Sequence, residues 1–329
     1  MAEFIIYSDI HHYKNPHNSY VCPDGANSWL FEQLKVVQRV FDYAKQHNVE
    51  TVIFDGDLYE SKDRIDFPTL NSVWRFYTQL AKEHRIIFNI GNHDYSTLDR
   101  QNSSLVTYSD NIQVIHAPTD IVFGDTLCRI VPHGMVEGNL GVPSSSPICL
   151  LFTHEVISDL RLGERSYSLK TTLKKEIFSD WTKVFNGHIH MPQEINNIIN
   201  IGSTMQQDFG EAGESKRFIH YKDGEIISIP VTAPEFFIYP ELTEELKDKI
   251  ADDDTNFYRI DIPPESLGDS IFQKYNVSFR VKRNTERKVR LKETKTDKEE
   301  LFEYITIINP NDLNRKKLLK IGLELRGQV

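Results

Sequence analysis

Cysteine, long apolar runs and excess positive charge are all scarce in this sequence of 329 residues. Its three cysteines, Cys22, Cys128 and Cys149, are odd in number and far apart, which argues against a disulfide framework and against a cysteine-based zinc site. No apolar run approaches the roughly 20 residues that cross a bilayer, and the apolar strand near the first residue is unlike a signal peptide. We therefore expect a cytoplasmic protein with reduced thiols and no membrane partner.

The formal net charge of -10 argues against a protein whose whole surface grips nucleic acid. It remains compatible with an acidic metal site combined with a local basic patch. Hydrophobic residues make up 39% and charged residues 26% of the chain, which are ordinary values for a globular protein. The length allows one large domain and a smaller one.

The first two thirds of the sequence alternate apolar strands with amphipathic helices. Strand-like segments at 4–7, 49–54 and 85–90, each with an apolar core of three or four residues, are separated by helical patterns, which predicts parallel strands covered on both faces. From Ile112 onward the pattern becomes rich in strands, with a hairpin around Gly124-Asp125. This order predicts an α/β sandwich of two sheets.

The character of the sequence changes near residue 233, where we place a domain boundary. Residues 1–233 are the predicted main domain, and residues 234–308 a smaller α+β domain with a short helix and two strands. The last segment, 309–329, follows Asn309-Pro310 and has the leucine spacing of a helix. Its apolar side chains could dock on a partner or pack against the second domain.

Five short polar motifs follow apolar strands: Asp9-Ile10-His11, Gly56-Asp57, Gly91-Asn92-His93-Asp94, Thr153-His154 and Gly187-His188-Ile189-His190. A single motif of this kind is more often found on a surface or in a core than in a metal site. In open α/β sheets, however, the carboxyl ends of the strands converge on one edge, where ligands bind. Five such motifs in this arrangement therefore predict one shared site.

Imidazole and carboxylate ligands without thiolate suit manganese, iron or zinc. The motifs offer more ligands than one tetrahedral ion needs, whereas two ions about 3.5–4 Å apart that share a carboxylate would use them all. Paired ions of this kind are typical of enzymes that cleave phosphate esters.

The motifs in this order resemble the signature of the calcineurin-like metallophosphoesterase superfamily, which is D-x-H, GD, GNH(D/E), H and GH-x-H. The resemblance covers residues 4–230 and implies a four-layer α/β/β/α sandwich that carries two divalent ions. By this resemblance one ion is bound by Asp9, His11, Asp57 and His190, and the other by Asp57, Asn92, His154 and His188. His93 would not be a ligand. It would meet the phosphate and stabilise the transition state or protonate the leaving oxygen, with Asp94 orienting its ring.

Within that superfamily the sequence departs from the protein serine/threonine phosphatases, which carry GD-x-V-D-R-G and GNHE. It is more similar to the SbcD-type double-strand-break repair nucleases and their bacteriophage relatives, which pair GD-(I/L)-(F/Y) with GNHD. The stretch from Ile201 to Glu211 also resembles their G-S-x-x-x-x-x-F-x-E segment. One departure is Glu60, because cellular eukaryotic and archaeal members have a histidine at this position. The phosphate contact made by that histidine therefore cannot be assigned to this sequence.

This closer resemblance implies a DNA exonuclease, with single-strand endonuclease activity as an addition, that acts on double- and single-stranded DNA. It also implies manganese in preference to magnesium, iron or zinc, a homodimer, a capping domain at 234–308 and an SbcC-type coiled-coil ATPase partner. The alternative is a metallophosphoesterase that acts on a small phosphodiester, a nucleotide or a phosphoprotein.

A basic segment in the second domain is the candidate DNA contact. Cations that neutralise phosphates give sequence-independent binding, although the segment could equally be a solvated face. Its candidate residues are Arg280, Lys282, Arg283, Arg287, Lys288 and Arg290.

Overall fold

The computed structural model describes residues 2–282, except 24, 98–101, 142–146, 164–170 and 172, together with residues 301, 318 and 321. One compact unit comprises residues 1–262 and 266–280, and a second comprises 263–265 and 281–329. Almost all of the second unit, including most of the predicted helix of 309–329, lies outside the described residues.

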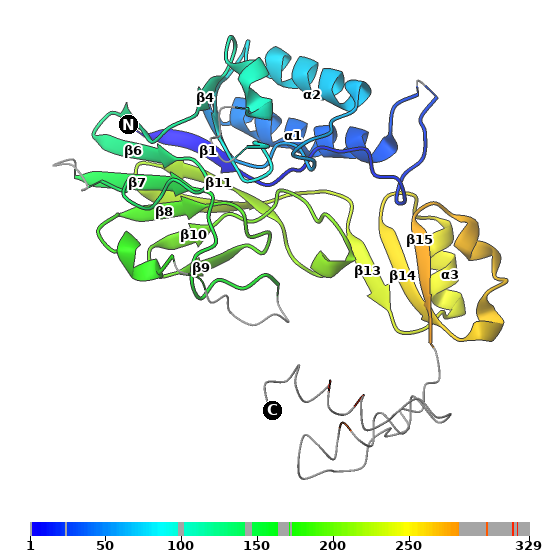
Figure 1. Cartoon of the computed structure of the whole chain (residues 1–329). Helices are drawn as coiled ribbons and strands as arrows, with labels where there is room; N and C mark the ends of the chain where they lie inside the picture. The colour runs from blue at the N-terminus through cyan, green and yellow to red at the C-terminus, as the bar shows by residue number, and fades with distance from the viewer. Residues whose placement is uncertain are drawn as a thin grey trace. The chain divides into compact units, whose positions relative to one another are not determined.

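The first sheet has six strands in the order β12-β11-β1-β2-β3-β4 (Figure 1). Strands β1 to β4 are parallel, and β11 and β12 join antiparallel beside β1. The strands are β1 (Glu3–Tyr7), β2 (Thr51–Asp55), β3 (Arg85–Asn89), β4 (Gln113–Ile115), β11 (Arg217–Lys222) and β12 (Glu225–Pro230).

The second sheet also has six strands, in the order β5-β6-β7-β8-β10-β9. Strands β6, β7, β8 and β10 are parallel, while β5 and β9 pair antiparallel at the two edges, β5 through the predicted hairpin. The strands are β5 (Thr119–Phe123), β6 (Thr126–Val131), β7 (Ile148–Thr153), β8 (Lys183–Asn186), β9 (Gln193–Ile195) and β10 (Ile198–Asn200).

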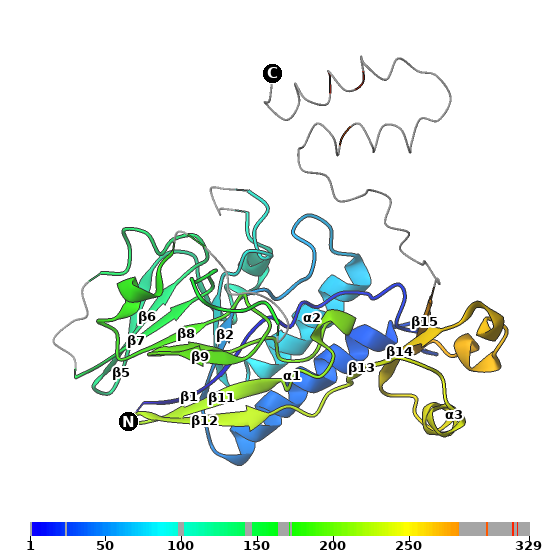
Figure 2. The ribbon, with the colours of Figure 1, turned by 90° about the horizontal axis from the view of Figure 1, so that it is seen from below.

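Two amphipathic helices, α1 (Ser28–Gln46) and α2 (Phe67–Leu80), cover the face of the first sheet that points away from the second (Figures 1 and 2). Asn27 caps α1 and Asp66 caps α2, because each side chain accepts a hydrogen bond from a backbone N–H of the first turn. Successive side chains of a strand point to opposite faces, so each strand of the first sheet contributes to two cores. Ile5 and Tyr7 of β1 pack with the helices, whereas its Phe4 and Ile6 pack against the second sheet.

The outer face of the second sheet differs from the predicted fourth layer of helices. In the described part of the chain this face is covered by loops and a 3-10 helix, η2 (Lys175–Phe178), and no α-helix lies there. Phe178, the last residue of this turn, and Trp181, three residues later, are buried in one core with Leu151 and Val184 of the sheet. Two bulky aromatic rings exclude water from the sheet without a helix. The chain is therefore an α/β fold with two stacked sheets, and among the described residues α-helices cover the first sheet alone.

A third, three-stranded sheet follows, in the order β13-β14-β15. It consists of β13 (Phe236–Tyr239), β14 (Phe257–Ile262) and β15 (Val277–Val281), and the helix α3 (Glu244–Ala251) packs on it through a small core of its own. Phe236 and Phe257 contact the ring of Trp29 in α1. The remaining 3-10 turns are η1 (Ser104–Tyr108), η3 (Phe209–Glu211), η4 (Pro264–Ser266) and η5 (Ser270–Gln273).

Candidate metal centre

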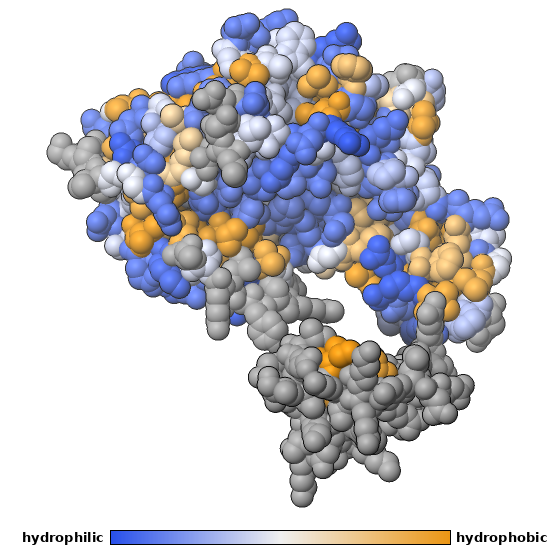
Figure 3. Space-filling view, viewed as in Figure 1, coloured by the Kyte–Doolittle hydropathy of each residue, from blue (hydrophilic) through white to orange (hydrophobic). Residues whose placement is uncertain are grey.

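The five sequence motifs meet where strands of both large sheets end. In the first sheet β1, β2 and β3 are neighbours, and they lead to Asp9, to Asp57 and to the Asn92-His93 pair. In the second sheet the neighbours β7 and β8 lead to His154 and to the two histidines that follow Gly187. The middle of the molecular face shown in Figure 3 is hydrophilic, in contrast to the apolar patches around it.

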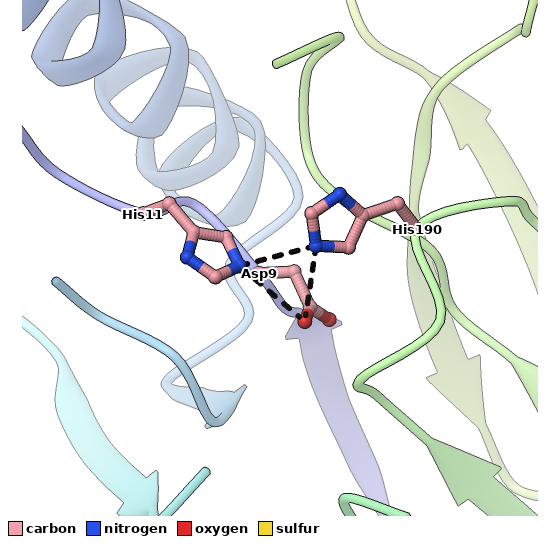
Figure 4. A group of neighbouring side chains, drawn as sticks. All are labelled: Asp9, His11 and His190. Atoms are coloured by element: carbon pink, nitrogen blue, oxygen red, sulfur yellow. Dashed lines mark hydrogen bonds and ion pairs between the residues drawn. The ribbon is translucent and has the colours of Figure 1, made fainter. Parts of the chain in front are cut away.

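Asp9, His11 and His190 form a first triad of possible ligands (Figure 4). The Nε2 atoms of the two histidines lie 3.1 Å apart, and Asp9 Oδ1 lies 3.8 Å from one and 3.9 Å from the other. The three side chains come from both sheets and point toward one another (Figure 4).

Asp57, His154 and His188 form a second triad. Asp57 Oδ2 lies 3.2 Å from His154 Nε2 and 3.6 Å from His11 Nε2, so this carboxylate stands between the two triads. The side-chain oxygen of Asn92 lies 2.5 Å from His188 Nδ1. All seven predicted ligands are therefore brought into one cluster.

Four of these residues have left-handed backbone conformations. Asp9, His11, Asp57 and His188 have φ between 49° and 75°, a region that residues with a Cβ atom enter at a cost of roughly 1–3 kcal/mol. Such strain persists only where the surrounding structure over-determines it, and it gathers at functional sites.

The charges of the cluster fit divalent cations. Burial alone would raise the pKa of Asp9, but the nearby histidines outweigh it and bring the pKa down to about 2. Burial would likewise lower the pKa of His11, yet the carboxylates around it raise the pKa to about 10. His154 is fully buried, and its Nε2 atom has no hydrogen-bond partner among the described residues. Buried carboxylates facing an unpartnered imidazole nitrogen are the donor set that Mn, Fe or Zn prefers.

His93 lies at the mouth of this cluster. Its backbone N–H donates to Asp57 Oδ1 at 2.7 Å, and its ring stands edge-on to that of His11 with centroids 4.8 Å apart. A group of His11, Asp57 and His93 is itself compact enough to hold an ion, so proximity alone does not separate His93 from the ligands.

The expected contact between Asp94 and the His93 ring is corrected by the structure. His93 Nδ1 donates instead to the backbone carbonyl of Glu60, at 2.5 Å. The buried carboxylate of Asp94 accepts hydrogen bonds from the backbone N–H groups of Asp57, Leu58 and Gly91, at 2.8–2.9 Å. Asp94 therefore holds two motif loops together, and it acts on His93 only through them.

Several groups around the ligands were not singled out by their sequence spacing. Glu211 accepts a hydrogen bond from His190 Nδ1 at 2.6 Å, and Glu60 Oε2 lies 2.9 Å from His11 Nδ1. The ring of His133 stacks on that of His188 with centroids 5.5 Å apart, and its Nδ1 donates to the carbonyl of His154. Two of them carried a signal in the sequence: Glu211 is the last residue of the stretch that begins at Ile201, and Glu60 stands at the position where the sequence departs from the family pattern.

The neighbours Asp55 and His12 take different places. The backbone carbonyl of Asp55, rather than its carboxylate, accepts the hydrogen bond from His154 Nδ1 at 2.5 Å. His12 is buried and its Nε2 lies 3.3 Å from the hydroxyl of Tyr77, away from the two triads.

The candidate DNA contacts fall mostly outside the described residues, which include only Arg280 and Lys282. Arg280 is exposed and pairs with Asp261, its Nε 2.7 Å from Oδ1. Lys282 is also exposed. The others, Arg283, Arg287, Lys288 and Arg290, lie in the part that is not described. None of the described helices is long and apolar enough to cross a membrane.

A glycine substitution tests how tightly this site is packed. In Gly91→Ala the new Cβ atom would overlap the carboxylate and the backbone nitrogen of Asp57. We expect the variant to lose metal binding and roughly 1–3 kcal/mol of stability, as overpacked sites do. Metal content and thermal unfolding measure both effects. The control is Gly268→Ala, whose Cβ atom meets nothing within 4 Å; equal behaviour of the two variants would contradict the close packing.

The comparisons with known proteins agree with this geometry. A family model described as calcineurin-like phosphoesterase matches residues 2–213. A candidate phosphoesterase, 078R, of Invertebrate iridescent virus 3 is 26% identical over 221 residues, which cover 61% of this chain and 62% of that protein. Exonuclease subunit 1 of Enterobacteria phage T4 is 24% identical over 200 residues, covering 56% of this chain and 57% of that protein. Both matches thus span less than two thirds of the relative.

Two solved structures are similar at lower identity. A dimetal phosphatase from Danio rerio has 10% identity and a TM-score of 0.41, with 70% of this chain and 99% of that chain covered. The nuclease MPE of Pseudomonas putida has 16% identity and a TM-score of 0.33, with 69% and 87% covered.

Proposed function

The chain belongs to the calcineurin-like phosphoesterase family, and from that premise we propose that it is a two-metal phosphodiesterase that hydrolyses DNA. It would serve as the nuclease subunit of a recombination or repair complex. The observation that carries the proposal is the pair of neighbouring triads at the strand ends of the two sheets, in which Asp57 of the second triad lies 3.6 Å from His11 of the first.

In this proposal one ion is held by Asp9, His11, His190 and Asp57, and the other by Asp57, Asn92, His154 and His188. Two such ions stabilise the attacking and the leaving oxygens of an in-line displacement at phosphorus. His154 and His190 each donate a hydrogen bond from Nδ1, so the proton of each neutral ring is on Nδ1. The lone pair of Nε2 in each ring is therefore available to bind metal.

His93 and Asp94 divide the remaining work. The carbonyl of Glu60 holds the Nδ1–H of His93, so the Nε2 side of the ring is available to the phosphate. A proton on Nε2 can stabilise negative charge on the phosphate or pass to the leaving oxygen. Asp94 contributes by fixing the backbone of the Asp57 loop, and through it the carboxylate shared by both ions.

DNA is the substrate class that the similarities favour. One relative is named an exonuclease subunit, and the loop after Asp57 and the stretch from Ile201 to Glu211 match the nuclease branch of the family. We propose exonuclease activity with single-strand endonuclease activity in addition, and manganese as the working metal. The basic segment that begins at Arg280 would supply phosphate contacts.

The assembly is proposed on the same grounds. Residues 234–308, which include the third sheet, would be a capping domain over the DNA, and residues 309–329 would contact a coiled-coil ATPase subunit. A homodimer in the cytoplasm completes the proposal. The three free cysteines are compatible with that compartment.

A direct assay separates the proposed nuclease from the alternative phosphoesterase. Purified chain with Mn²⁺ is incubated with linear duplex DNA, single-stranded DNA and a small chromogenic phosphodiester, with and without an ATPase partner. We expect manganese-dependent shortening of both DNA substrates, abolished by a chelator. Intact DNA together with rapid hydrolysis of the small ester would overturn the DNA assignment and favour a small phosphodiester, nucleotide or phosphoprotein.

A further inference from the structure

The two triads differ in what stands behind their histidines. In the first triad the Nε2 atom of each histidine points into the cluster, and its Nδ1 atom faces a carboxylate outside it. His190 Nδ1 donates to Glu211 Oε1 at 2.6 Å, and His11 Nδ1 lies 2.9 Å from Glu60 Oε2. Two negative charges therefore support the histidines of this triad.

In the second triad the outward nitrogen of His154 faces an uncharged group instead, because His154 Nδ1 donates to the backbone carbonyl of Asp55. The contact of His188 Nδ1 with the Asn92 side-chain oxygen, at 2.5 Å, joins two proposed ligands of the same ion and adds no charge behind the ring. The ring that stacks on His188 is another imidazole, that of His133. The carboxylates that approach His154 are those of Asp57 and Asp9, which are proposed ligands themselves and lie on its Nε2 side, 3.2 and 3.7 Å away.

Glu211 is held firmly in its place. Its Oε2 atom lies 2.7 Å from Lys216 Nζ, and it accepts hydrogen bonds from Ser203 Oγ and from the backbone of Gln207. Lys216 is itself buried and donates to the carbonyl of His190 at 2.9 Å and to Glu214 at 2.8 Å. Glu60, by contrast, has a half-exposed side chain, so solvent weakens its effect.

A carboxylate behind a ligand histidine fixes the tautomer and makes the ligating nitrogen more basic, and its removal typically costs about 10–100-fold in metal affinity. We infer that the two metal positions are inequivalent. The position of Asp9, His11 and His190 fills first, and Glu211 and Glu60 are the positioning residues that set this order. The inference rests on the proposed two-metal function and adds to it an order of loading.

The test is a Mn²⁺ titration of the metal-free full-length chain, followed by electron paramagnetic resonance and calorimetry. In the unaltered chain the first equivalent should give the spectrum of an isolated ion, and the second equivalent the spectrum of a coupled pair. Glu211→Gln should weaken the first binding step by roughly 10–100-fold and the second by less than about threefold. Glu60→Gln should shift the same step by a smaller factor.

Glu214→Gln is the matched control, because Glu214 shares Lys216 with Glu211 but contacts neither ligand histidine. It should leave both affinities unchanged, and unfolding curves show whether each variant is folded. An unchanged first step in folded Glu211→Gln and Glu60→Gln, or equal weakening of both steps, would overturn the order of loading. A chain that binds no Mn²⁺ at all would instead contradict the proposed function.

Discussion

Replacing Asp57 with asparagine is expected to abolish DNA hydrolysis and to empty both metal positions. Asp57 Oδ2 lies within 3.6 Å of a histidine nitrogen in each triad, and we propose that this one carboxylate binds both ions. Removal of a residue that merely orients a ligand already costs about 10–100-fold in metal affinity, and the loss of a shared ligand should exceed that. Elemental analysis after gel filtration, together with the DNA assay, measures both effects.

The fold should survive this change. Asparagine keeps the shape of the side chain, and its oxygen can still accept the hydrogen bond that His93 N–H donates to Asp57 Oδ1. Asp63→Asn, an exposed position six residues later, is the matched control and should keep full metal content and activity. Two ions retained in Asp57→Asn would show that the carboxylate is not shared between them.

The second large effect is expected for His93→Ala, which should keep both metals and lower kcat on DNA by roughly 10²–10⁴-fold. The expectation follows from the position of the ring at the mouth of the cluster, with Nδ1 held by the carbonyl of Glu60. His93 also lies close enough to His11 and Asp57 to be a metal ligand. The metal content of the variant distinguishes a ligand from a residue that acts only on the phosphate. Loss of one ion in the variant would assign His93 to the ligands.

The choice of substrate tells which task His93 performs. Hydrolysis of DNA expels an alkoxide, which benefits from a proton, whereas an aryl phosphodiester expels a stable phenolate. If His93 protonates the leaving oxygen, the alanine variant should lose far more activity on DNA than on the aryl ester. Equal losses would assign it to stabilisation of charge on the phosphate. His116→Ala, at an exposed position, serves as the control and should be fully active.

The ligands could be predicted because each belongs to a short motif after an apolar strand. The strands were recognisable from their runs of apolar residues, and the parallel order places their carboxyl ends at one edge. This information was enough to predict that Asp9, Asp57, His154 and His188 lie at one site. The same reasoning could not assign partners to Asp94, whose hydrogen bonds reach residues 36 and 37 positions earlier in the chain.

The layer on the outer face of the second sheet shows a second limit of the sequence. Family resemblance predicts helices there, but the described residues present a short 3-10 turn with Phe178 and Trp181. Burial of an apolar sheet face requires apolar area rather than a particular secondary structure. Two large rings supply that area, and their spacing in the sequence does not distinguish a helix from a turn.

The sequence by itself determined the family, the two-sheet α/β class and the residues offered to the metals, because these depend on local periodicity and on motifs of a few residues. Only the tertiary structure decided which groups stand behind those residues. Glu211, Glu60 and the carbonyl of Asp55 each contact a ligand histidine that lies 21 to 99 positions away in the sequence. Contacts of this kind follow from how the two sheets and their loops pack, and the difference that we infer between the two metal positions rests on that packing.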